Sequence, residues 1–355
     1  MENTYCVIMA GGIGSRFWPM STPSKPKQFL DILGTGKTLL QQTFDRFIQT
    51  CEPEKVFVVT NEKYKYLVSD QLPQIPEENI LCEPLRRNTA PCIAFAAYKI
   101  KKANPNATIV VSPADHLVLK EDSFTETIKL AIEQARNNSS LITLGIKPSR
   151  PDTGYGYIQF MDEDSHPDKR VKKVKTFMEK PNLELAKQFI SSGDFYWNSG
   201  IFIFNSKAIV NAFDEYLNDV HQIFSEGNEA LNTSSEKAFI EQAFEKCPNI
   251  SIDYGIMEKA SNVDVVLADF GWSDLGTWGS LYTHLDKDSN NNGVVGNQVN
   301  LHDTKDTVVH IQGNQTAIIQ GLEDYIVVLA NDTLLISKKS EEQRIKSFVN
   351  SLNNK

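Results

Sequence analysis

The residues best suited to chemistry near the start of the chain form a glycine-rich loop followed by basic side chains. The loop comes directly after an apolar run at 5–9 and contains Gly11, Gly12 and Gly14. Glycine tolerates positive φ and has no Cβ, so this backbone can approach a ligand closely and present successive N–H groups to an anion. Three cations follow on a proline-stiffened segment, namely Arg16, Lys25 and Lys27. A guanidinium fork and two compact ammonium groups beside such a loop predict a polyphosphate site.

Two better-known phosphate loops do not fit this sequence. The dinucleotide-binding fingerprint requires a third glycine, and that position holds Phe17. The Walker pattern is approached at 36–38, but its first glycine would fall at Asp31. A glycine-rich turn after a strand can also be a simple connection into a helix. The basic residues that follow favour the phosphate site.

Two aspartates are candidates for a metal site. Asp115 comes just after an apolar run at 108–112, and Asp274 lies in a glycine-containing loop. A lone carboxylate beside nucleotide phosphates would repel them, so these residues make most sense as ligands of magnesium, which prefers oxygen donors. Each has an alternative interpretation. Asp115 could occupy a turn or helix N-cap, and Asp274 could be the N-cap of a helix at 275–285.

Other polar residues lie where strands end. Asn88 and Thr89 precede a helix expected at 89–102, where capping alone would explain them. Glu179 could accept hydrogen bonds from sugar hydroxyls and Lys180 could meet a phosphate, although a surface turn would look the same. Asn198 lies among aromatic residues, an environment that suits either a sugar or an ordinary core.

The elements that must position these residues alternate between strand and helix. Compact apolar runs predict strands at 5–9, 55–60, 80–82, 108–112 and 141–145. Helical spacing of apolar residues predicts helices at 39–48, 62–71, 89–102 and 125–134. This order predicts an α/β fold with a parallel sheet covered by helices on both faces. Ligands of such folds bind at the carboxyl ends of the strands, where the candidate residues lie.

The second half of the chain has a different pattern of apolar and polar residues. Runs at 154–158 and 171–178 alternate as half-exposed mixed or antiparallel strands do. A polar break at 286–293 predicts a domain boundary, and short apolar runs beyond it predict a small β module. We therefore expect a domain at 1–285, with a nucleotide half at about 1–150 and a sugar-phosphate half at about 151–285, followed by a module at 294–355.

The composition of the chain excludes several classes of protein. A net charge of −9 over 355 residues argues against a general binder of nucleic acid or of anionic membranes. Five dispersed cysteines form no C-x-x-C pair, which argues against a disulfide framework, and six dispersed histidines argue against zinc. Because the start has no basic signal region and no run approaches membrane length, we expect a cytoplasmic protein.

At the glycine loop the sequence resembles a known family. Gly11-Gly-x-Gly-x-Arg16 with Pro26-Lys-Gln-Phe-Leu30 is similar to the signature of the sugar-phosphate nucleotidyltransferases. The Lys-Gln-Phe-Leu form resembles its mannose-1-phosphate guanylyltransferases. The resemblance continues through ordered motifs to about residue 278. It implies a Rossmann-like, GT-A-like mixed sheet flanked by helices and, at the C-terminus, a left-handed β-helix-like module used for assembly.

The resemblance also implies roles for the candidate residues. It assigns the leaving phosphates to the glycine loop and Arg16, and charge neutralisation to Lys27, with Lys25 a weaker candidate. Three residues are implied to read the nucleotide base or ribose: Glu83, Asn88 and Thr89. Four are implied to bind the sugar phosphate: Gly156, Glu179, Lys180 and Asn198. Asp115 and Asp274 are implied to bind Mg²⁺.

The implied reaction joins GTP and mannose 1-phosphate to give GDP-mannose and pyrophosphate, by in-line attack on the α-phosphorus. Alternatives are a guanylyltransferase for a heptose or fucose phosphate, a uridylyl or thymidylyl relative acting on glucose 1-phosphate, and a non-catalytic sensor or assembly subunit. We expect a homodimer with no nucleic-acid or membrane partner. Because the chain ends before the position of the isomerase domain of longer relatives, we expect no isomerase activity.

Overall fold

The computed structural model describes residues 3–12, 14–162 and 166–353, and it divides the chain into two compact units. Unit 1 comprises Met1–Gly11, Phe44–Ala114 and Val118–Trp272. Unit 2 comprises Gly12–Thr43, Asp115–Leu117 and Ser273–Lys355. Three elements contain residues of both units: α1 (Leu39–Phe47), β5 (Leu117–Val118) and β11 (Trp272–Ser273).

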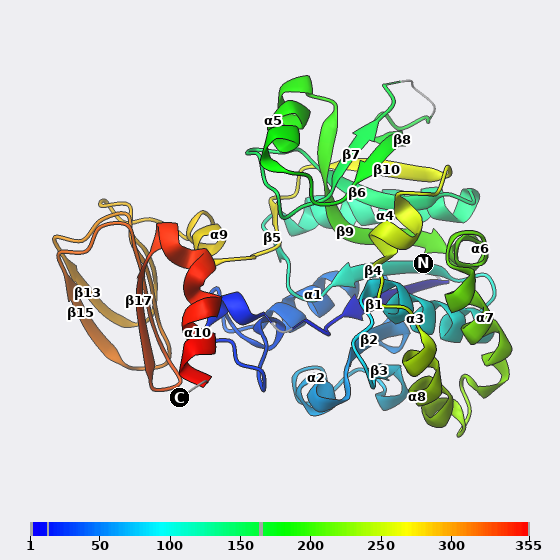
Figure 1. The fold of residues 1–355 in the computed structure, drawn as a ribbon, viewed down its shortest axis with the longest axis horizontal. Helices are drawn as coiled ribbons and strands as arrows, with labels where there is room; N and C mark the ends of the chain where they lie inside the picture. The colour runs from blue at the N-terminus through cyan, green and yellow to red at the C-terminus, as the bar shows by residue number, and fades with distance from the viewer. Residues whose placement is uncertain (1–2, 13, 163–165, 354–355) are drawn as a thin grey trace. The chain divides into compact units, whose positions relative to one another are not determined.

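Unit 1 is built on a nine-stranded mixed sheet with the order β3-β2-β1-β4-β9-β6-β10-β8-β7 (Figure 1). Its strands are β1 (Thr4–Met9), β2 (Val56–Asn61), β3 (Ile80–Glu83), β4 (Thr108–Pro113), β6 (Leu141–Ile146), β7 (Tyr157–Phe160), β8 (Val171–Met178), β9 (Phe195–Asn205) and β10 (Val263–Ala268). Strands β1 to β4 are mutually parallel, β9 is antiparallel to both β4 and β6, and β7 and β8 are antiparallel. The predicted change from parallel strands early in the chain to antiparallel strands later in the chain is therefore confirmed.

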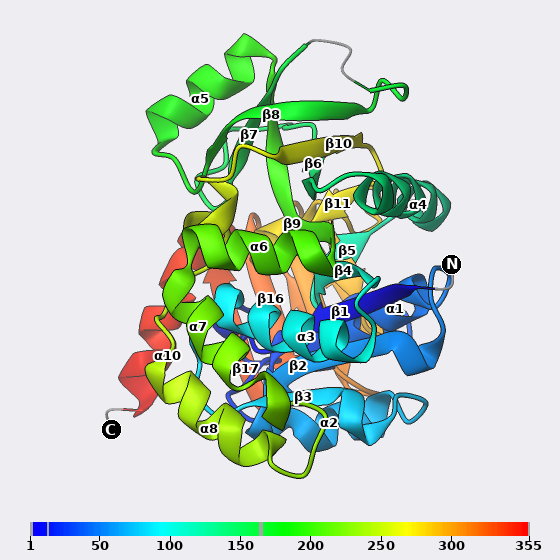
Figure 2. The same ribbon diagram turned by 90° about the vertical axis from the view of Figure 1, so that its right-hand side faces the viewer.

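Helices cover both faces of this sheet. They are α2 (Lys65–Gln71), α3 (Thr89–Ala103), α4 (Glu121–Asn137), α5 (Leu183–Ser192), α6 (Ser206–Tyr216), α7 (Asn218–Glu226) and α8 (Glu236–Lys246). Figure 2 shows α3, α6, α7 and α8 gathered over one face. Inner strands such as β4 are buried along almost their whole length, because both sides of each strand face helices. Among the described helices, none is long and apolar enough to cross a membrane.

Unit 2 contains two short parallel sheets beside the N-terminal loop segment. Its strands are β12 (Gly293–Val295), β13 (Gln298–His302), β14 (Val308–Ile311), β15 (Thr316–Gln320), β16 (Tyr325–Ala330) and β17 (Thr333–Lys338), and its helices are α9 (Trp278–Tyr282) and α10 (Ile345–Asn353). One sheet stacks β12, β14 and β16 in parallel and ends with an antiparallel β17, while the other pairs β13 with β15. Figure 1 shows these strands layered as successive turns of a coil. Parallel stacking of this kind fits a β-helix-like module, and its handedness stays a prediction.

The division into units differs from the boundary expected at 286–293. Buried residues of the loop segment, such as Phe17 and Ile32, share one apolar cluster with Trp278, Val308 and Ile326. The glycine loop from Gly12 onward and the C-terminal strands therefore belong to the same compact unit. Contacts between positions so distant in the chain leave no mark on local periodicity.

Two local expectations are corrected by the structure. The helix expected at 275–285 begins at Trp278 and is capped by Thr277, whose side chain accepts from the Ser280 N–H. Asp274 is therefore not its N-cap. Thr277 and Ser280 instead form a reciprocal cap, which satisfies two backbone donors of a very short helix.

Candidate active site

A polar cavity of about 280 Å³ in unit 2 gathers several of the predicted residues. Its lining comprises Gly14, Arg16, Phe17, Lys27, Asp115, His116, Asp274, Gly276 and Lys346. The first four come from the N-terminal loop, and the others from three segments far along the chain. The structure thus places the predicted guanidinium, one predicted lysine and both predicted metal-binding carboxylates around one cavity.

Lys27 is the centre of this group. Its side chain is 6% exposed, and its Nζ lies 3.0 Å from Oδ2 of Asp115. The same Nζ donates to the carbonyl oxygens of Asp274, at 2.8 Å, and of Leu275, at 3.0 Å. An ammonium group has three N–H donors, so these partners use all of them. Lys27 therefore fixes Asp115 against the 274–275 backbone.

The glycine loop is shaped around this lysine. Gly14 has a φ of 57°, and a Cβ added there would lie 2.5 Å from Cβ of Lys27 and 2.9 Å from its backbone nitrogen. Only glycine combines this conformation with this approach. The side-chain amide of Gln28 donates to the carbonyl oxygen of Gly12 at 2.9 Å, which fixes the start of the loop.

Charge in the cavity favours an ionised Asp115. Burial opposes ionisation, but the nearby charges of Lys27 and His116 lower the pKa of the Asp115 carboxyl below its ordinary value. The Asp274 carboxylate accepts from the backbone N–H of Gly276 at 3.0 Å. This second carboxylate is held in place by its own loop.

The donor set around the cavity fits a hard divalent cation. No group of three or more His, Cys, Asp or Glu side chains suitable for a metal occurs among the described residues. Magnesium, however, is commonly bound by one or two carboxylates together with substrate phosphates and water. Asp115 and Asp274 supply the two carboxylates, so a metal here would depend on the phosphates for its remaining ligands.

Lys25 lies apart from this group. It is exposed and lines a different cavity of unit 2, of about 530 Å³, together with residues such as Asp31 and His310. Of the three predicted cations, Arg16 and Lys27 share the small cavity and Lys25 does not.

A second group of predicted residues lies in unit 1, around the end of β8. The side chain of Glu179 is 7% exposed and pairs with Lys180, whose φ is 50°. A Cβ at Gly156 would lie 2.4 Å from Oε2 of Glu179 and 3.3 Å from Cβ of Asn198. The absence of a side chain at residue 156 therefore allows Glu179 and Asn198 to approach each other.

Asn198 is tied to the protein on both sides of its amide. Its Oδ1 accepts from Oγ1 of Thr143, at 2.9 Å, and from the Gly200 N–H, at 3.1 Å. Its Nδ2 donates to Oδ1 of Asp253 at 2.9 Å. Asp253 was not predicted as a site residue, because 251–258 reads as the start of a helix. The signal available in the sequence was a carboxylate within the largely apolar stretch 252–257.

The residues predicted to read the nucleotide base also lie in unit 1. Burial raises the pKa of Glu83 to about 8, against the opposing charge of Arg86. Its Oε1 has no hydrogen-bond partner in the part of the chain that the structure describes, and its Oε2 lies 3.2 Å from the position of a Cβ on Gly11. This carboxyl group is therefore buried beside the start of the glycine loop with unused hydrogen-bonding capacity.

Asn88 and Thr89, which were predicted with Glu83 to read the nucleotide, each make a hydrogen bond within the protein. Asn88 is the N-cap of α3, and its side chain accepts from the Thr89 N–H at 2.9 Å. Oγ1 of Thr89 accepts from the Ile252 N–H at 2.9 Å. The capping alternative for Asn88 is thus present in the structure.

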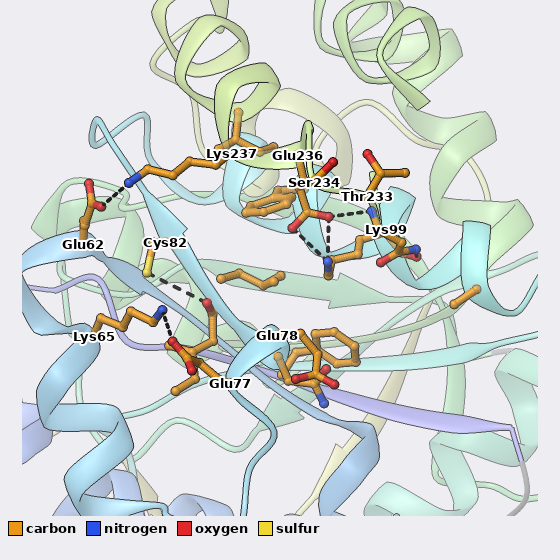
Figure 3. Close-up of a pocket in the computed structure, with 18 of the residues that line it drawn as sticks. Glu62, Lys65, Glu77, Glu78, Cys82, Lys99, Thr233, Ser234, Glu236 and Lys237 are labelled. Atoms are coloured by element: carbon orange, nitrogen blue, oxygen red, sulfur yellow. Dashed lines mark hydrogen bonds and ion pairs between the residues drawn. The ribbon is translucent and has the colours of Figure 1, made fainter. Parts of the chain in front are cut away.

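A larger cavity of unit 1, of about 760 Å³, is less suited to phosphates (Figure 3). Its three lysines are each paired with a glutamate: Lys65 with Glu77, Lys99 with Glu236, and Lys237 with Glu62. Its lining holds six glutamates, the other three being Glu54, Glu78 and Glu241. Because negative charge outnumbers positive charge, this cavity would repel a polyphosphate.

The chain is similar to known proteins over nearly its whole length. It matches the nucleotidyl transferase family over residues 5–291. A mannose-1-phosphate guanylyltransferase of Escherichia coli is 37% identical over 98% of this chain and 75% of the relative. The alginate biosynthesis protein AlgA of Pseudomonas aeruginosa is 36% identical over 98% of this chain and 71% of the relative. A Thermus thermophilus structure described as a mannose-1-phosphate geranyltransferase has a TM-score of 0.87 at 30% identity, covering 99% of both chains.

Proposed function

The chain belongs to the nucleotidyl transferase family, and we propose that it transfers GMP from GTP to mannose 1-phosphate, giving GDP-mannose and pyrophosphate. Relatives named for this activity cover nearly the whole chain. The structural observation that carries the proposal is the cavity that brings Arg16, Lys27, Asp115 and Asp274 together.

In the proposed reaction, a phosphate oxygen of mannose 1-phosphate attacks the α-phosphorus of GTP. The bond to the bridging oxygen of the β-phosphate breaks on the opposite side, and that oxygen leaves with pyrophosphate. No covalent enzyme intermediate is needed. Catalysis then depends on positioning and on electrostatic stabilisation of the phosphates.

The protein groups of unit 2 supply much of this stabilisation. The Arg16 guanidinium and the backbone N–H groups of the glycine loop hold phosphate oxygens. Lys27 keeps Asp115 ionised and in place. Lys25, exposed and in another cavity, has a lesser role in the proposal.

The family generally uses a divalent metal ion, and we propose Mg²⁺ with Asp115 and Asp274 as its protein ligands. When bound, the ion supplies positive charge that offsets the charge of the phosphate oxygens. The two carboxylates around one cavity support this assignment.

The residues of unit 1 provide the proposed specificity. Glu179 accepts hydrogen bonds from the sugar and Asn198 faces the sugar, while Lys180 meets the sugar phosphate. When ionised, the Glu83 carboxyl complements guanine, which offers adjacent N–H donors at N1 and N2 where adenine does not, and such donors favour the ionised form against the burial that raises its pKa. Asn88 and Thr89 are proposed to contact the nucleotide beside Glu83; Asn88 also caps α3, and Thr89 also joins the start of α3 to the segment at Ile252.

We also propose that the protein forms a homodimer and is located in the cytoplasm. A homodimer is expected, and light scattering coupled to gel filtration measures it directly. All five cysteines are free thiols, which suits the reducing cytoplasm.

Pyrophosphate release tests the function directly. We expect turnover with mannose 1-phosphate and GTP, its loss on chelation of divalent cations, and its return on addition of Mg²⁺. ATP, UTP, dTTP and glucose 1-phosphate serve as alternative substrates. Turnover with another pair would change the assigned substrates but leave the proposed mechanism in place. No turnover with any pair would contradict the proposed enzymatic activity.

Two variants test the assigned roles. Arg16→Ala and Asp274→Asn should each reduce kcat by about 100-fold or more, because each removes a charge aimed at the phosphates or the metal. Circular dichroism confirms that each variant is folded. A variant with wild-type turnover at saturating substrate would remove that residue from the mechanism.

A further inference from the structure

Asp253 is a carboxylate without an assigned role that lies among the proposed sugar-binding residues of unit 1. It begins a short π-helical turn, Asp253–Met257. The segment before it is bonded to the start of α3, through the Ile252 N–H to Oγ1 of Thr89, at 2.9 Å, and the Ala90 N–H to the Ile250 carbonyl, at 3.1 Å. Asp253 is therefore held in position by the segment proposed to carry the base-reading residues.

The hydrogen bonds of Asn198 limit what that residue can do. Its Oδ1 accepts from the Gly200 N–H and from the Thr143 hydroxyl, whose single proton is shared with the Ile201 carbonyl oxygen, at 3.2 Å. One of its two N–H donors is given to Asp253. Asn198 can therefore donate one further hydrogen bond to a ligand, while its oxygen is already engaged within the protein. A sugar hydroxyl that must donate has to find its acceptor elsewhere.

Asp253 offers such an acceptor. In the described part of the chain, no side chain other than Asn198 donates a hydrogen bond to its carboxylate. Asp253 is only partly buried. The carboxylate also accepts from the backbone N–H of Asp253, and of its roughly four lone-pair sites those that remain are available to a ligand while the Asn198 amide fixes Oδ1.

Two carboxylates close together are unfavourable unless a donor separates them. Burial and the nearby charge of Glu179 raise the pKa of Asp253 to about 6, while Lys180 and the Asn198 hydrogen bond act in the opposite direction. The hydroxyl groups of a sugar are uncharged donors, and they could satisfy both carboxylates at once. A phosphate, in contrast, would be repelled by this pair.

We propose that Asp253 is a specificity-determining residue, which accepts a hydrogen bond from one hydroxyl group of the sugar 1-phosphate next to Glu179. Asn198 then acts as a donor and as the group that orients Asp253. This inference rests on the proposed function, because it assigns the sugar-recognising role within that reaction. The competing view is that Asp253 only supports Asn198.

The experiment compares Asp253→Asn with wild type on mannose 1-phosphate and its 2-, 3-, 4- and 6-deoxy analogues. Asp253→Asn keeps the size of the side chain and removes the charged acceptor. We expect kcat/KM for mannose 1-phosphate to fall about 30-fold, since a hydrogen bond to a charged group is lost. For the one analogue that lacks the partner hydroxyl, the same substitution should cost less than about 3-fold. KM for GTP should stay within about 2-fold.

The matched control is Asp219→Asn, an exposed aspartate in α7 that also removes one negative charge. It should leave all five values of kcat/KM unchanged. An equal loss with every analogue in Asp253→Asn would overturn the proposal, because a residue that only supports Asn198 has no preferred hydroxyl. No loss with any substrate would overturn it as well.

A second measurement uses wild type alone and so does not depend on the folding of a variant. The ratio of kcat/KM for mannose 1-phosphate to that for each analogue is followed from pH 5 to 8, which cancels the ionisation of the substrate phosphate. For the analogue without the partner hydroxyl, we expect this ratio to rise with pH around 6, as Asp253 ionises beside Glu179 and Lys180. Ratios that are flat for every analogue would contradict the proposal.

The outcome is separable from that of the proposed function. If wild type does not use mannose 1-phosphate, the proposed substrate fails, and the same deoxy series is built on the sugar phosphate that it does use. If wild type is active on mannose 1-phosphate and shows no hydroxyl-specific coupling, the proposed function stands and the role of Asp253 fails.

Discussion

Asp115 in unit 2 and Asp253 in unit 1 are both partly buried aspartates, yet their surroundings shift their pKa values in opposite directions. Asp115 lies beside Lys27, and its pKa is lowered although burial opposes this. Asp253 lies beside Glu179, and burial together with that neighbouring charge raises its pKa to about 6. The sign of the dominant neighbouring charge therefore decides the direction of the pKa shift, since burial acts in the same direction on both.

The difference indicates two kinds of chemistry. A carboxylate kept ionised by a lysine is suited to a site where phosphates and a metal ion meet. A carboxylate paired with another carboxylate is suited to uncharged O–H donors such as those of a sugar. One residue type thus serves two purposes, and its neighbours set which one.

Replacing Lys27 should give the largest effect and would remove the cause of the difference. In Lys27→Met, Asp115 keeps its burial and loses its cation, so its pKa should rise toward that of Asp253. We expect kcat to fall by at least about 100-fold and the free energy of unfolding to fall by about 3 kcal/mol. Steady-state kinetics and urea unfolding measure the two effects.

Lys338→Met, at an exposed position in β17, is the control for the Lys27 variant. It should change neither quantity appreciably. A Lys27→Met enzyme that unfolds at lower urea but retains wild-type kcat would limit Lys27 to holding the loop.

Gly156→Ala should have an intermediate effect on activity, because it disturbs the neighbouring carboxylates Glu179 and Asp253. The added Cβ would lie 2.4 Å from Oε2 of Glu179, so the flexible end of Glu179 must move. We expect KM for the sugar phosphate to rise about 10-fold with little change in KM for GTP. Gly154→Ala is the matched control, because its nearest contact is 3.1 Å, to Oδ1 of Asp152. Equal changes in the two KM values would show that the sugar-binding residues were not specifically disturbed.

The smallest effect is expected for pH-dependent stability, tested at a third buried carboxyl. The pKa of Glu83 in the folded protein is about 8, above its ordinary value of 4.5. The folded state thus holds a proton that the unfolded state releases between these pH values, so this group makes stability fall as pH rises from about 4.5 to about 8. Asp115 has the opposite sign, since its lowered pKa adds stability that is lost on acidification.

Glu83→Gln should remove the part of the fall in stability with rising pH that comes from the Glu83 carboxyl group. Between pH 5 and 8.5, we expect the Tm of wild type to fall by about 3 °C or more relative to that of the variant. Differential scanning fluorimetry over this range measures both proteins. Parallel curves would mean that Glu83 titrates normally in the folded protein.

Much of the fold could be predicted from the sequence because its signals are local. Apolar runs marked most strands of the large sheet, and the capping alternative considered for Asn88 is present in the structure. Strands β12 and β13 and helix α10 were not predicted, since β13 alternates between exposed and partly buried residues over only five positions. The cap at Thr277 was missed because Asp274 also has a side chain typical of N-caps.

The candidate site was only partly predictable. Residue types pointed to Arg16, Lys25 and Lys27, and the family resemblance favoured Asp115 and Asp274 as metal ligands over the turn and cap alternatives. The structure places all of these except Lys25 around one cavity. The bonds that Lys27 makes to the backbone at 274 and 275 join positions 247 and 248 residues apart, and hydrophobic periodicity cannot indicate such a contact. Asp253 was also missed, because its proposed role depends on Asn198 and Glu179, which are distant from it in the sequence.

The close approach of Gly14 to Lys27 has a consequence for how this sequence can change over generations. A side chain at position 14 would collide with the backbone nitrogen and Cβ of residue 27; the nitrogen remains whichever residue replaces the lysine, and the Cβ remains for every residue except glycine. Replacing the lysine therefore does not make room at 14, where the positive φ also favours glycine. In a library randomised at both positions and selected for a folded protein, we expect glycine at 14 in every survivor, whichever residue stands at 27.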